Sequence, residues 1–393
     1  MKKILFVIDS LGVGGAEKSL ITLLNSIDYE QYSVDLQLFS KGGAFEKYLP
    51  KHVSVLKLPK YIHYTQNRIL NSLNIKYFRY FVARFKYSLL LRLFPSSKHT
   101  TKAMLFWKST SSCFDKTKKY DIAIAYGQGV PTFYVADKVL ANKKFAWINA
   151  LLYFEHNVLK YNCSKYLKFD KIVTVSTSSF ENFTSLYNQF TQKTTIIKDL
   201  IDQNFIKQMS LNDSSPSIKH SCFKILTVAR LDNGHKGYDI ALDVAKILKE
   251  RGVDFVWYAV GEGGFRSEME TFIKENNLTD KFVLLGAKDN PYPYFRACDL
   301  YVQTSRHEGF GLSIAEARIL NKPVVTTEFE AVWNQMVQGK NGVVVPIDAT
   351  AVADAIQDLI ENPEKMNAIS DYQRTEKKGN IEELQKFYLL IES

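Results

Sequence analysis

The stretch from 305 to 320, SRHEGFGLSIAEARIL, holds the residues whose types and spacing best suit chemistry. Its two glutamates, Glu308 and Glu316, stand eight positions apart, and Gly309 and Gly311 follow the first, where a loop is expected to turn into a helix. Backbone N–H groups at a helix start lack intrahelical partners, so they can bind a phosphate or sugar hydroxyls. Glu308 in the loop can accept hydrogen bonds from a sugar, and Glu316, about two turns further on, can reach a ribose. On spacing alone, such a pair of glutamates is more often only solvated.

A stretch upstream, VARLDNGHKG, places two cations close together. Arg230 is expected at the end of a strand, and Lys236 stands six residues later, before a helix. Fixed positive charges in a water-poor site strongly stabilise the negative charge that develops on a leaving diphosphate. Without its context, the same pair is equally well interpreted as two solvated surface cations.

Short apolar runs alternate with amphipathic stretches along the chain, which predicts an α/β protein. Continuous runs rich in Val and Ile suit parallel strands covered by helices on both faces. The polar stretch Ser210–Ser217, SLNDSSPS, interrupts the alternation as an interdomain connection would. We therefore predict two doubly wound domains, 1–205 and 206–375, that bind ligands where the carboxyl ends of their strands face a crevice. A closing helix is expected in 376–393 and can cross back to the first domain. The predicted strands are ILFVI, VDLQLF, VSVLKL, DIAIAY, FAWI, KIVTVS and TTIIKD, then KILTVA, DFVWYAV, KFVLLG, LYVQTS, PVVTT and GVVVP.

Composition and the cysteines narrow the class of protein. Hydrophobic residues make up 46% of the chain and charged residues 23%, as in globular proteins. The four cysteines are far apart, which argues against a zinc site or a disulfide framework and favours a reducing, cytoplasmic setting. The apolar run Ile4–Ile8 stops at Asp9 with no cleavage site after it, so we expect a buried strand rather than a signal peptide. No apolar run is long enough to predict a spanning helix.

The net charge of +10 is concentrated in one segment. Residues 60–119 contain thirteen Lys or Arg and a single acid, Asp115. Within this segment, residues 76–94 predict a basic amphipathic helix that can lie in a membrane interface and attract anionic lipids. The alternative is that its aromatic face packs on the core of the first domain. Nucleic acid is disfavoured as a partner because no recognised binding motif accompanies the charge. The apolar face would consist of Phe78, Phe81, Val82, Phe85 and Leu89, with Arg92 intruding on it.

Five motifs follow one another along the chain. They are G-G-A-E at 14–17, V-A-R-L-D-x-x-x-K-G at 228–237, V-G-E-G at 260–263, N-P-Y at 290–292 and E-G-F-G-L-S-I-A-E at 308–316. In this order they resemble glycosyltransferase family 4, over nearly the whole chain and most strongly over 224–346. The resemblance implies the GT-B fold, with two Rossmann-like, doubly wound parallel-sheet domains facing a cleft. It also implies sugar transfer with retention of anomeric configuration.

The resemblance further implies roles for single residues. The expected catalytic residues are Arg230 and Lys236, which would clamp the diphosphate, and Glu308, which would touch the donor sugar. The family uses helix dipoles and cations in place of a metal, so we expect neither a metal nor a cofactor. The expected donor-binding residues are Gly14, Gly15, Gly309, Phe310, Gly311, Leu312 and Glu316, the last as the ribose ligand.

One position departs from the family's pattern. Many relatives carry a histidine after the A-W-I strand, where this chain has Asn149. Asn149 can still hydrogen-bond the donor sugar or the acceptor. His156 can substitute for the missing histidine, although a lone histidine is more often structural. Since neither residue suits a nucleophile, we favour a same-face reaction in which the leaving diphosphate helps deprotonate the acceptor.

The sequence thus predicts a cytoplasmic, metal-independent hexosyltransferase at the inner face of the cell membrane. The donor would be a nucleotide-diphosphate sugar such as a UDP-sugar, and the acceptor a glycan or lipid-linked precursor of a capsule or exopolysaccharide. A sugar-nucleotide 2-epimerase of the same architecture remains an alternative, as does a catalytically silent nucleotide-sugar-binding protein. A nicotinamide dehydrogenase is disfavoured because Gly12–Gly15 does not form G-x-G-x-x-G.

Overall fold

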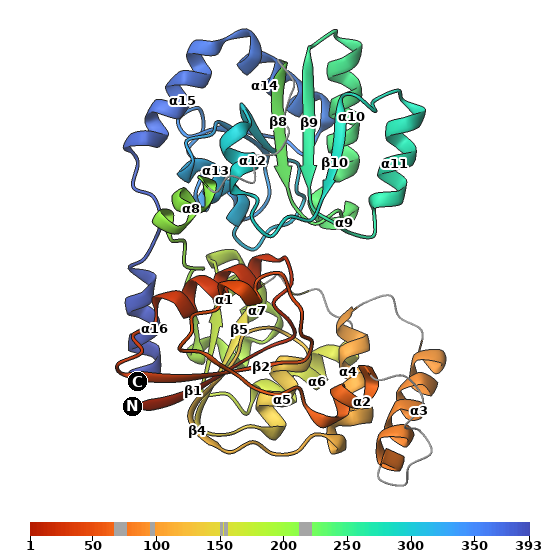
Figure 1. The fold of residues 1–393 in the computed structure, drawn as a ribbon, viewed down its shortest axis with the longest axis vertical. Coiled ribbons are helices and arrows are strands. Elements are labelled where there is room, and N and C mark those ends of the chain that lie inside the picture. The colour runs from red at the N-terminus through yellow and green to blue at the C-terminus, as the bar shows by residue number, and fades with distance from the viewer. Residues whose placement is uncertain (67–76, 95–98, 150–151, 153–155, 212–221) are drawn as a thin grey trace. The chain divides into compact units, whose positions relative to one another are not determined.

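The computed structural model describes residues 1–66, 77–94, 99–149, 152, 156–211 and 222–393 (Figure 1). The chain forms two compact units, which are described separately. The first consists of Met1–Asp199 together with Glu383–Ser393, and the second of Leu200–Glu382. Most of the polar connection predicted from the sequence, 212–217, lies outside the described residues.

The first unit is built on a seven-stranded sheet in the order β3-β2-β1-β4-β5-β6-β7, in which every pairing is parallel. The order reverses between β1 and β4, and ligands of doubly wound sheets bind beyond the strand ends at such a point. Residues 4–8 of β1 are buried, as a strand covered on both faces requires. The strands are β1 (Lys2–Ile8), β2 (Tyr32–Leu38), β3 (Ser54–Val55), β4 (Lys119–Ala125), β5 (Leu140–Ile148), β6 (Lys171–Thr174) and β7 (Thr194–Ile196).

Helices cover this sheet, and the last helix of the chain belongs to the same unit. Phe387 of that helix stacks on Phe6 with ring centroids 6.3 Å apart, and the hydroxyl of Tyr32 donates to Glu392 Oε1 at 2.7 Å. These contacts join the end of the chain to its first strands. The helices are α1 (Gly15–Ser26), α2 (Lys60–Gln66), α3 (Phe78–Leu93), α4 (His99–Thr110), α5 (Val130–Lys138), α6 (His156–Tyr166), α7 (Thr177–Leu186) and α16 (Glu383–Glu392).

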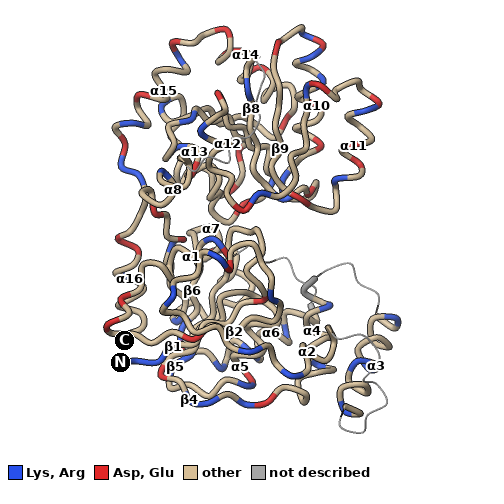
Figure 2. The backbone as a smooth tube through the Cα atoms, in the orientation of Figure 1, with Lys and Arg blue, Asp and Glu red and all other residues tan. Residues whose placement is uncertain are grey.

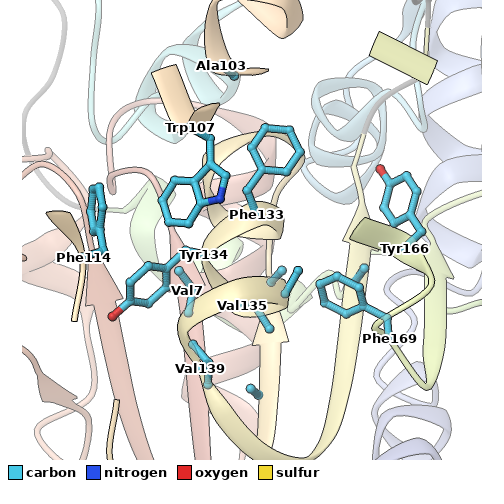
Figure 3. Close-up of a cluster of buried hydrophobic side chains, with 14 of the residues drawn as sticks. Val7, Ala103, Trp107, Phe114, Phe133, Tyr134, Val135, Val139, Tyr166 and Phe169 are labelled. Carbon is cyan, nitrogen blue, oxygen red and sulfur yellow. The ribbon is translucent and has the colours of Figure 1, made fainter. Parts of the chain in front are cut away.

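A cluster of aromatic side chains forms much of the first unit's core (Figure 3). Trp107 of α4 packs against Phe114 with ring centroids 5.0 Å apart, and Tyr134 of α5 meets both rings edge-on. The buried Trp107 also donates its Nε1 hydrogen to Asp137 at 2.8 Å, so its polar atom is satisfied. Part of the basic segment 60–119 is therefore structural, because α4 carries residues of this core.

The second unit contains a six-stranded parallel sheet in the order β10-β9-β8-β11-β12-β13. Its order reverses between β8 and β11. These two strands lead into the two stretches that the sequence analysis singled out as suited to chemistry. The strands are β8 (Phe223–Val228), β9 (Phe255–Val260), β10 (Phe282–Gly286), β11 (Leu300–Gln303), β12 (Val324–Thr327) and β13 (Val343–Val345). The helices are α8 (Gln203–Ser210), α9 (Asn233–Lys236), α10 (Tyr238–Glu250), α11 (Arg266–Glu275), α12 (Tyr292–Ala297), α13 (Leu312–Ile319), α14 (Ala349–Glu361) and α15 (Pro363–Thr375).

Within the described residues, no helix has both the length and the apolar character needed to cross a bilayer.

Candidate functional site

The loops that follow β8 and β11 bring Lys236 and Glu308 into direct contact. Lys236 Nζ lies 2.6 Å from Glu308 Oε1, and both side chains are largely buried. The same oxygen accepts hydrogen bonds from Gln303 Nε2 and Ser305 Oγ, each at 2.8 Å. Because all three contacts fall on Oε1, the carboxylate is held in one orientation and Oε2 carries none of them.

An ion pair between Arg306 and Asp239 ties the loop after β11 to the first turn of α10. Arg306 donates to both carboxylate oxygens of Asp239, at 2.8 and 2.6 Å, and its backbone N–H donates to the carbonyl of His235 at 2.7 Å. Partial burial tends to raise the pKa of Asp239, but the hydrogen bonds and charge of Arg306 outweigh it and leave this pKa below its ordinary value. The bidentate geometry fixes the position of the loop that carries Glu308.

Glycine is required at position 237, directly after Lys236. Gly237 has a φ of +62°, and a Cβ built there would lie 2.1 Å from the carbonyl oxygen of Thr304. The hydroxyl of Thr304 donates to the carbonyls of Gly237 and Lys236, at 2.9 and 3.2 Å. This close approach of two backbones, open only to a residue without a side chain, places Lys236 beside Glu308.

The turn before α13 is held by a residue that the sequence analysis did not single out. Gln335 Nε2 donates to the carbonyl oxygens of Phe310, at 2.5 Å, and Gly311, at 3.1 Å. Gly311 caps α13 with a φ of +82°, so the helix begins at Leu312 as the sequence predicts. Gln335 lies twenty-four residues beyond Gly311 in the chain, and no spacing pattern points to it.

Glu316 lies inside the second unit, within the first turns of α13. Its side chain is buried, and its Oε1 accepts a hydrogen bond from the hydroxyl of Tyr292 at 3.1 Å. Tyr292 is the last residue of the N-P-Y motif and begins α12. Since α13 starts only at Leu312, Glu316 stands about one turn into the helix, and the loop accounts for the other half of the spacing from Glu308.

Arg230 is placed differently from Lys236. It follows β8, its side chain is 65% exposed, and its guanidinium lies 3.3 Å from Asp232. Asp232 also caps α9 by accepting from the backbone N–H of His235 at 2.9 Å. An exposed guanidinium paired with a surface carboxylate can reorient at little cost, so Arg230 is available to an anionic ligand.

The expected site residues of the first unit lie at the ends of its strands. Gly14 precedes α1 and Gly15 begins it. Asn149 directly follows β5, and its Nδ2 donates to the carbonyl of Tyr126 at 3.2 Å. Its Oδ1 is buried without a hydrogen-bond partner among the described residues, so one acceptor of this side chain is left unsatisfied. His156 begins α6, but its side chain lies outside the described residues.

A buried polar chain lies beside Asn149, and the sequence analysis missed it. The hydroxyl of Ser19 in α1 donates to Asp199 Oδ1 at 2.6 Å and lies 2.7 Å from the hydroxyl of Tyr126. Burial raises the pKa of Asp199 to about 6, although the hydrogen bond from Ser19 opposes this rise. The three residues come from separate parts of the chain, so only the folded unit brings them together.

Comparison with known proteins finds a family model that matches most of the second unit. Residues 211–376 match the family model described as glycosyl transferases group 1. The N-acetylgalactosamine-N,N'-diacetylbacillosaminyl-diphospho-undecaprenol 4-alpha-N-acetylgalactosaminyltransferase of Campylobacter jejuni is 27% identical over 216 residues. That match covers 54% of this chain and 57% of the relative, so the chain spans little more than half of that protein's length.

Solved structures match the whole chain. Anabaena Alr3699/HepE in complex with UDP and glucose has a TM-score of 0.71 at 20% identity, and both chains are covered in full. A mutant of S. aureus TarM in complex with Fondaparinux, alpha-GlcNAc-glycerol and UDP has a TM-score of 0.70 at 16% identity, also over both full chains. The two parallel-sheet units thus confirm the predicted α/β fold class. The chain has the GT-B fold, and its residues 211–376 match the family model of the glycosyl transferases group 1.

Proposed function

We propose that this chain is a retaining glycosyltransferase that moves a hexose from a nucleotide-diphosphate sugar to a glycan or lipid-linked acceptor. The observation that carries the proposal is the contact between Lys236 and Glu308 at the strand-order reversal of a group 1 domain. Ligands of doubly wound sheets bind at such a reversal. The narrower assignment to glycosyltransferase family 4 belongs to this proposal.

In the second unit, positively charged groups would bind the diphosphate of the donor, and hydrogen-bond acceptors would bind its sugar and its ribose. Lys236, Arg230 and the first backbone N–H groups of α13 would bind the diphosphate, since a helix start and fixed cations both favour anions. Glu308, oriented through Oε1, would accept hydrogen bonds from sugar hydroxyls with Oε2. Glu316 would bind the ribose, and Gly309 and Leu312 would present backbone N–H groups beside it.

Transfer would proceed on one face of the sugar. The bond between the anomeric carbon and the diphosphate oxygen breaks, and a bond from the same carbon to the acceptor oxygen forms on that face. The proton of the acceptor hydroxyl goes to an oxygen of the leaving diphosphate. Lys236 and Arg230 stabilise the charge that grows on this leaving group, so the reaction requires no metal.

The solved structures and the relative support this choice of donor and acceptor. HepE and TarM were both solved with UDP, which favours a UDP-sugar. The Campylobacter enzyme is named for a diphospho-undecaprenol acceptor, which favours a lipid-linked glycan precursor of a cell-surface polysaccharide. In the first unit, the unsatisfied Oδ1 of Asn149 would accept a hydrogen bond from a hydroxyl of the sugar or the acceptor.

A thermal-shift screen against nucleotide sugars tests the proposal. A donor at a hundred times its dissociation constant should stabilise the protein by about 2.7 kcal/mol. The stabilising donor is then incubated with glycan and polyprenyl-diphosphate acceptors, and the anomeric proton signal of the product is compared with that of the donor. Retained configuration in a transferred sugar supports the proposal. Conversion of the donor to an epimer without acceptor points to the epimerase, and binding without turnover of any acceptor points to the silent binding protein.

A further inference from the structure

Helix α3 is apolar on two opposite faces, and only one of them is covered. The inner face packs into the first unit: Tyr80 and Ala83 are buried, and the ring of Tyr80 meets that of Tyr61 at 5.6 Å. The outer face is exposed along its whole length, which rules out the alternative that these side chains pack on the core. Its exposed fractions are Phe78 64%, Phe81 46%, Val82 46%, Phe85 62%, Leu89 44% and Leu93 62%.

Cations lie beside the exposed face and, at Arg92, within it. Arg84, Lys86 and Arg92 project from the same helix and are exposed, and α3 contains no Asp or Glu. Figure 2 shows this helix with blue positions and no red one. Among the described residues, the neighbouring acid Asp115 contacts Lys60 and Arg79 instead. Within the described residues, the outer face of α3 therefore combines large apolar side chains with cations that have no ion-pair partner.

We propose that the outer face of α3 binds the surface of an anionic lipid bilayer. The helix would lie in the plane of the surface, with its phenylalanines among the acyl chains and its cations at the lipid head groups. Sixteen residues span roughly 24 Å, which gives an extended contact for a helix lying flat. A second copy of the chain is a poorer occupant, because pairing two such faces would bring their cations together.

This surface would bring the first unit to a lipid-linked acceptor, and that consequence alone rests on the proposed function. Lipid binding itself requires no donor and no turnover. The two proposals can therefore fail separately: a protein that binds vesicles without transferring sugar keeps this inference, and a protein that transfers sugar without binding vesicles keeps the other.

Sedimentation with lipid vesicles tests the inference on the full chain. Wild-type protein should pellet with phosphatidylglycerol-containing vesicles at low salt, and at least tenfold less with phosphatidylcholine alone or at high salt, where charge is screened. The double variant Phe81→Ser/Phe85→Ser should lose at least tenfold in partitioning. The triple variant Arg84→Gln/Lys86→Gln/Arg92→Gln should lose about a hundredfold, or roughly fivefold for each cation.

Leu167→Ser is the matched control, since Leu167 is 66% exposed in the same unit but lies outside α3. It should bind vesicles as the wild type does. The inference is overturned if wild-type protein fails to pellet with anionic vesicles at low salt, or if the phenylalanine variant binds as well as the control. It is also overturned if size exclusion without lipid shows a dimer that the phenylalanine variant alone dissociates.

A further variant, which gains a fluorescence signal, keeps the inference testable if the serine variants misfold. In Phe85→Trp, the added indole should enter the bilayer. Its fluorescence emission, obtained by subtracting the wild-type spectrum, should therefore shift to shorter wavelength with anionic vesicles. Leu167→Trp should show no such shift. A Phe85→Trp signal unchanged by vesicles contradicts the inference even if the serine variants unfold.

Discussion

The ammonium group of Lys236 lies 2.6 Å from Oε1 of Glu308, although the two stand seventy-two positions apart in the chain. The lysine ends α9 after the first strand of the second unit, and the glutamate follows the fourth strand of that unit. Two further donors, Gln303 and Ser305, hold the same oxygen. A cation and a hydrogen-bond acceptor are thus fixed side by side before any ligand arrives.

Removing either proposed phosphate-binding cation should slow sugar transfer without unfolding the protein. We expect Lys236→Ala and Arg230→Ala each to lower kcat by about a hundred- to a thousandfold, equivalent to roughly 2.7 to 4 kcal/mol of lost charge stabilisation. Steady-state kinetics with the cognate donor measure the effect. Lys340→Ala removes an exposed lysine of the same unit and serves as the control. Near-normal turnover of both alanine variants would refute the proposed role of the clamp.

Gln335→Met should weaken donor binding more than it destabilises the protein. The change removes the two hydrogen bonds that hold the carbonyls of Phe310 and Gly311, so the backbone at the start of α13 is no longer fixed. We expect the donor KM to rise by up to about thirtyfold with kcat less affected, since the two bonds together contribute roughly 2 kcal/mol.

The matched control for Gln335 is Gln338→Met. The side chain of Gln338 also forms hydrogen bonds with backbone atoms. Its Nε2 donates to the carbonyl of Val344, and its Oε1 accepts from the N–H of Val344, at the edge of the sheet. Its replacement should lower the melting temperature but leave the donor KM unchanged. Equal KM effects in the two variants would show that Gln335 has only a structural role.

Gly237→Ala should destabilise the second unit through a steric clash as well as through its backbone conformation. The new Cβ would meet the Thr304 carbonyl at 2.1 Å, which forces the loop of Lys236 away from that of Glu308. Gly252→Ala is the control, because Gly252 also has a positive φ, +72°, but nothing lies within 4 Å of its Cβ position. We expect the free energy of unfolding to fall by about 1 to 2 kcal/mol in the control. In Gly237→Ala it should fall by about 1 to 3 kcal/mol more, measured by urea unfolding. Equal losses of unfolding free energy in the two variants would mean that the loop of Lys236 moves to accommodate the new Cβ at no cost.

The buried carboxyl of Asp199 should make the stability of the first unit depend on pH. Its pKa is raised from 3.8 to about 6 by burial, so the folded state binds the proton more tightly than the unfolded state does. This contribution to stability is present below about pH 4 and is lost as the pH rises through about 6. Asp199→Asn cannot ionise. Its free energy of unfolding, relative to that of the wild type, should therefore increase by up to ~3 kcal/mol as the pH rises from 4 to 7.

Denaturant unfolding at several pH values measures this difference. Glu30→Gln changes an exposed acid of the same unit and controls for the loss of a carboxyl group. If the two variants change equally with pH relative to wild type, the burial of Asp199 has no energetic consequence and the interpretation of the Ser19–Asp199 contact is wrong.

The sequence by itself determined the features that depend on neighbours along the chain. The run of β1 is apolar at every position from Ile4 to Ile8, which predicts a strand buried on both faces of a parallel sheet, and the structure confirms it. The change from loop to helix at Gly311 was predicted for the same reason, because glycine and the residues after it determine the local backbone. The order of the motifs was enough to predict the GT-B fold, whereas the narrower assignment to family 4 stays a prediction.

Only the tertiary structure decided which distant residues meet and which helix face is covered. Gln335 reaches Phe310, and Ser19 reaches Asp199, through packing that no periodicity along the chain encodes. Similarly, amphipathicity marked α3 but left open whether its phenylalanines are covered, because both of its faces are apolar. Periodicity reports the chemistry of each face, whereas contact depends on the shape of everything packed around it, and that shape exists only once the chain has folded.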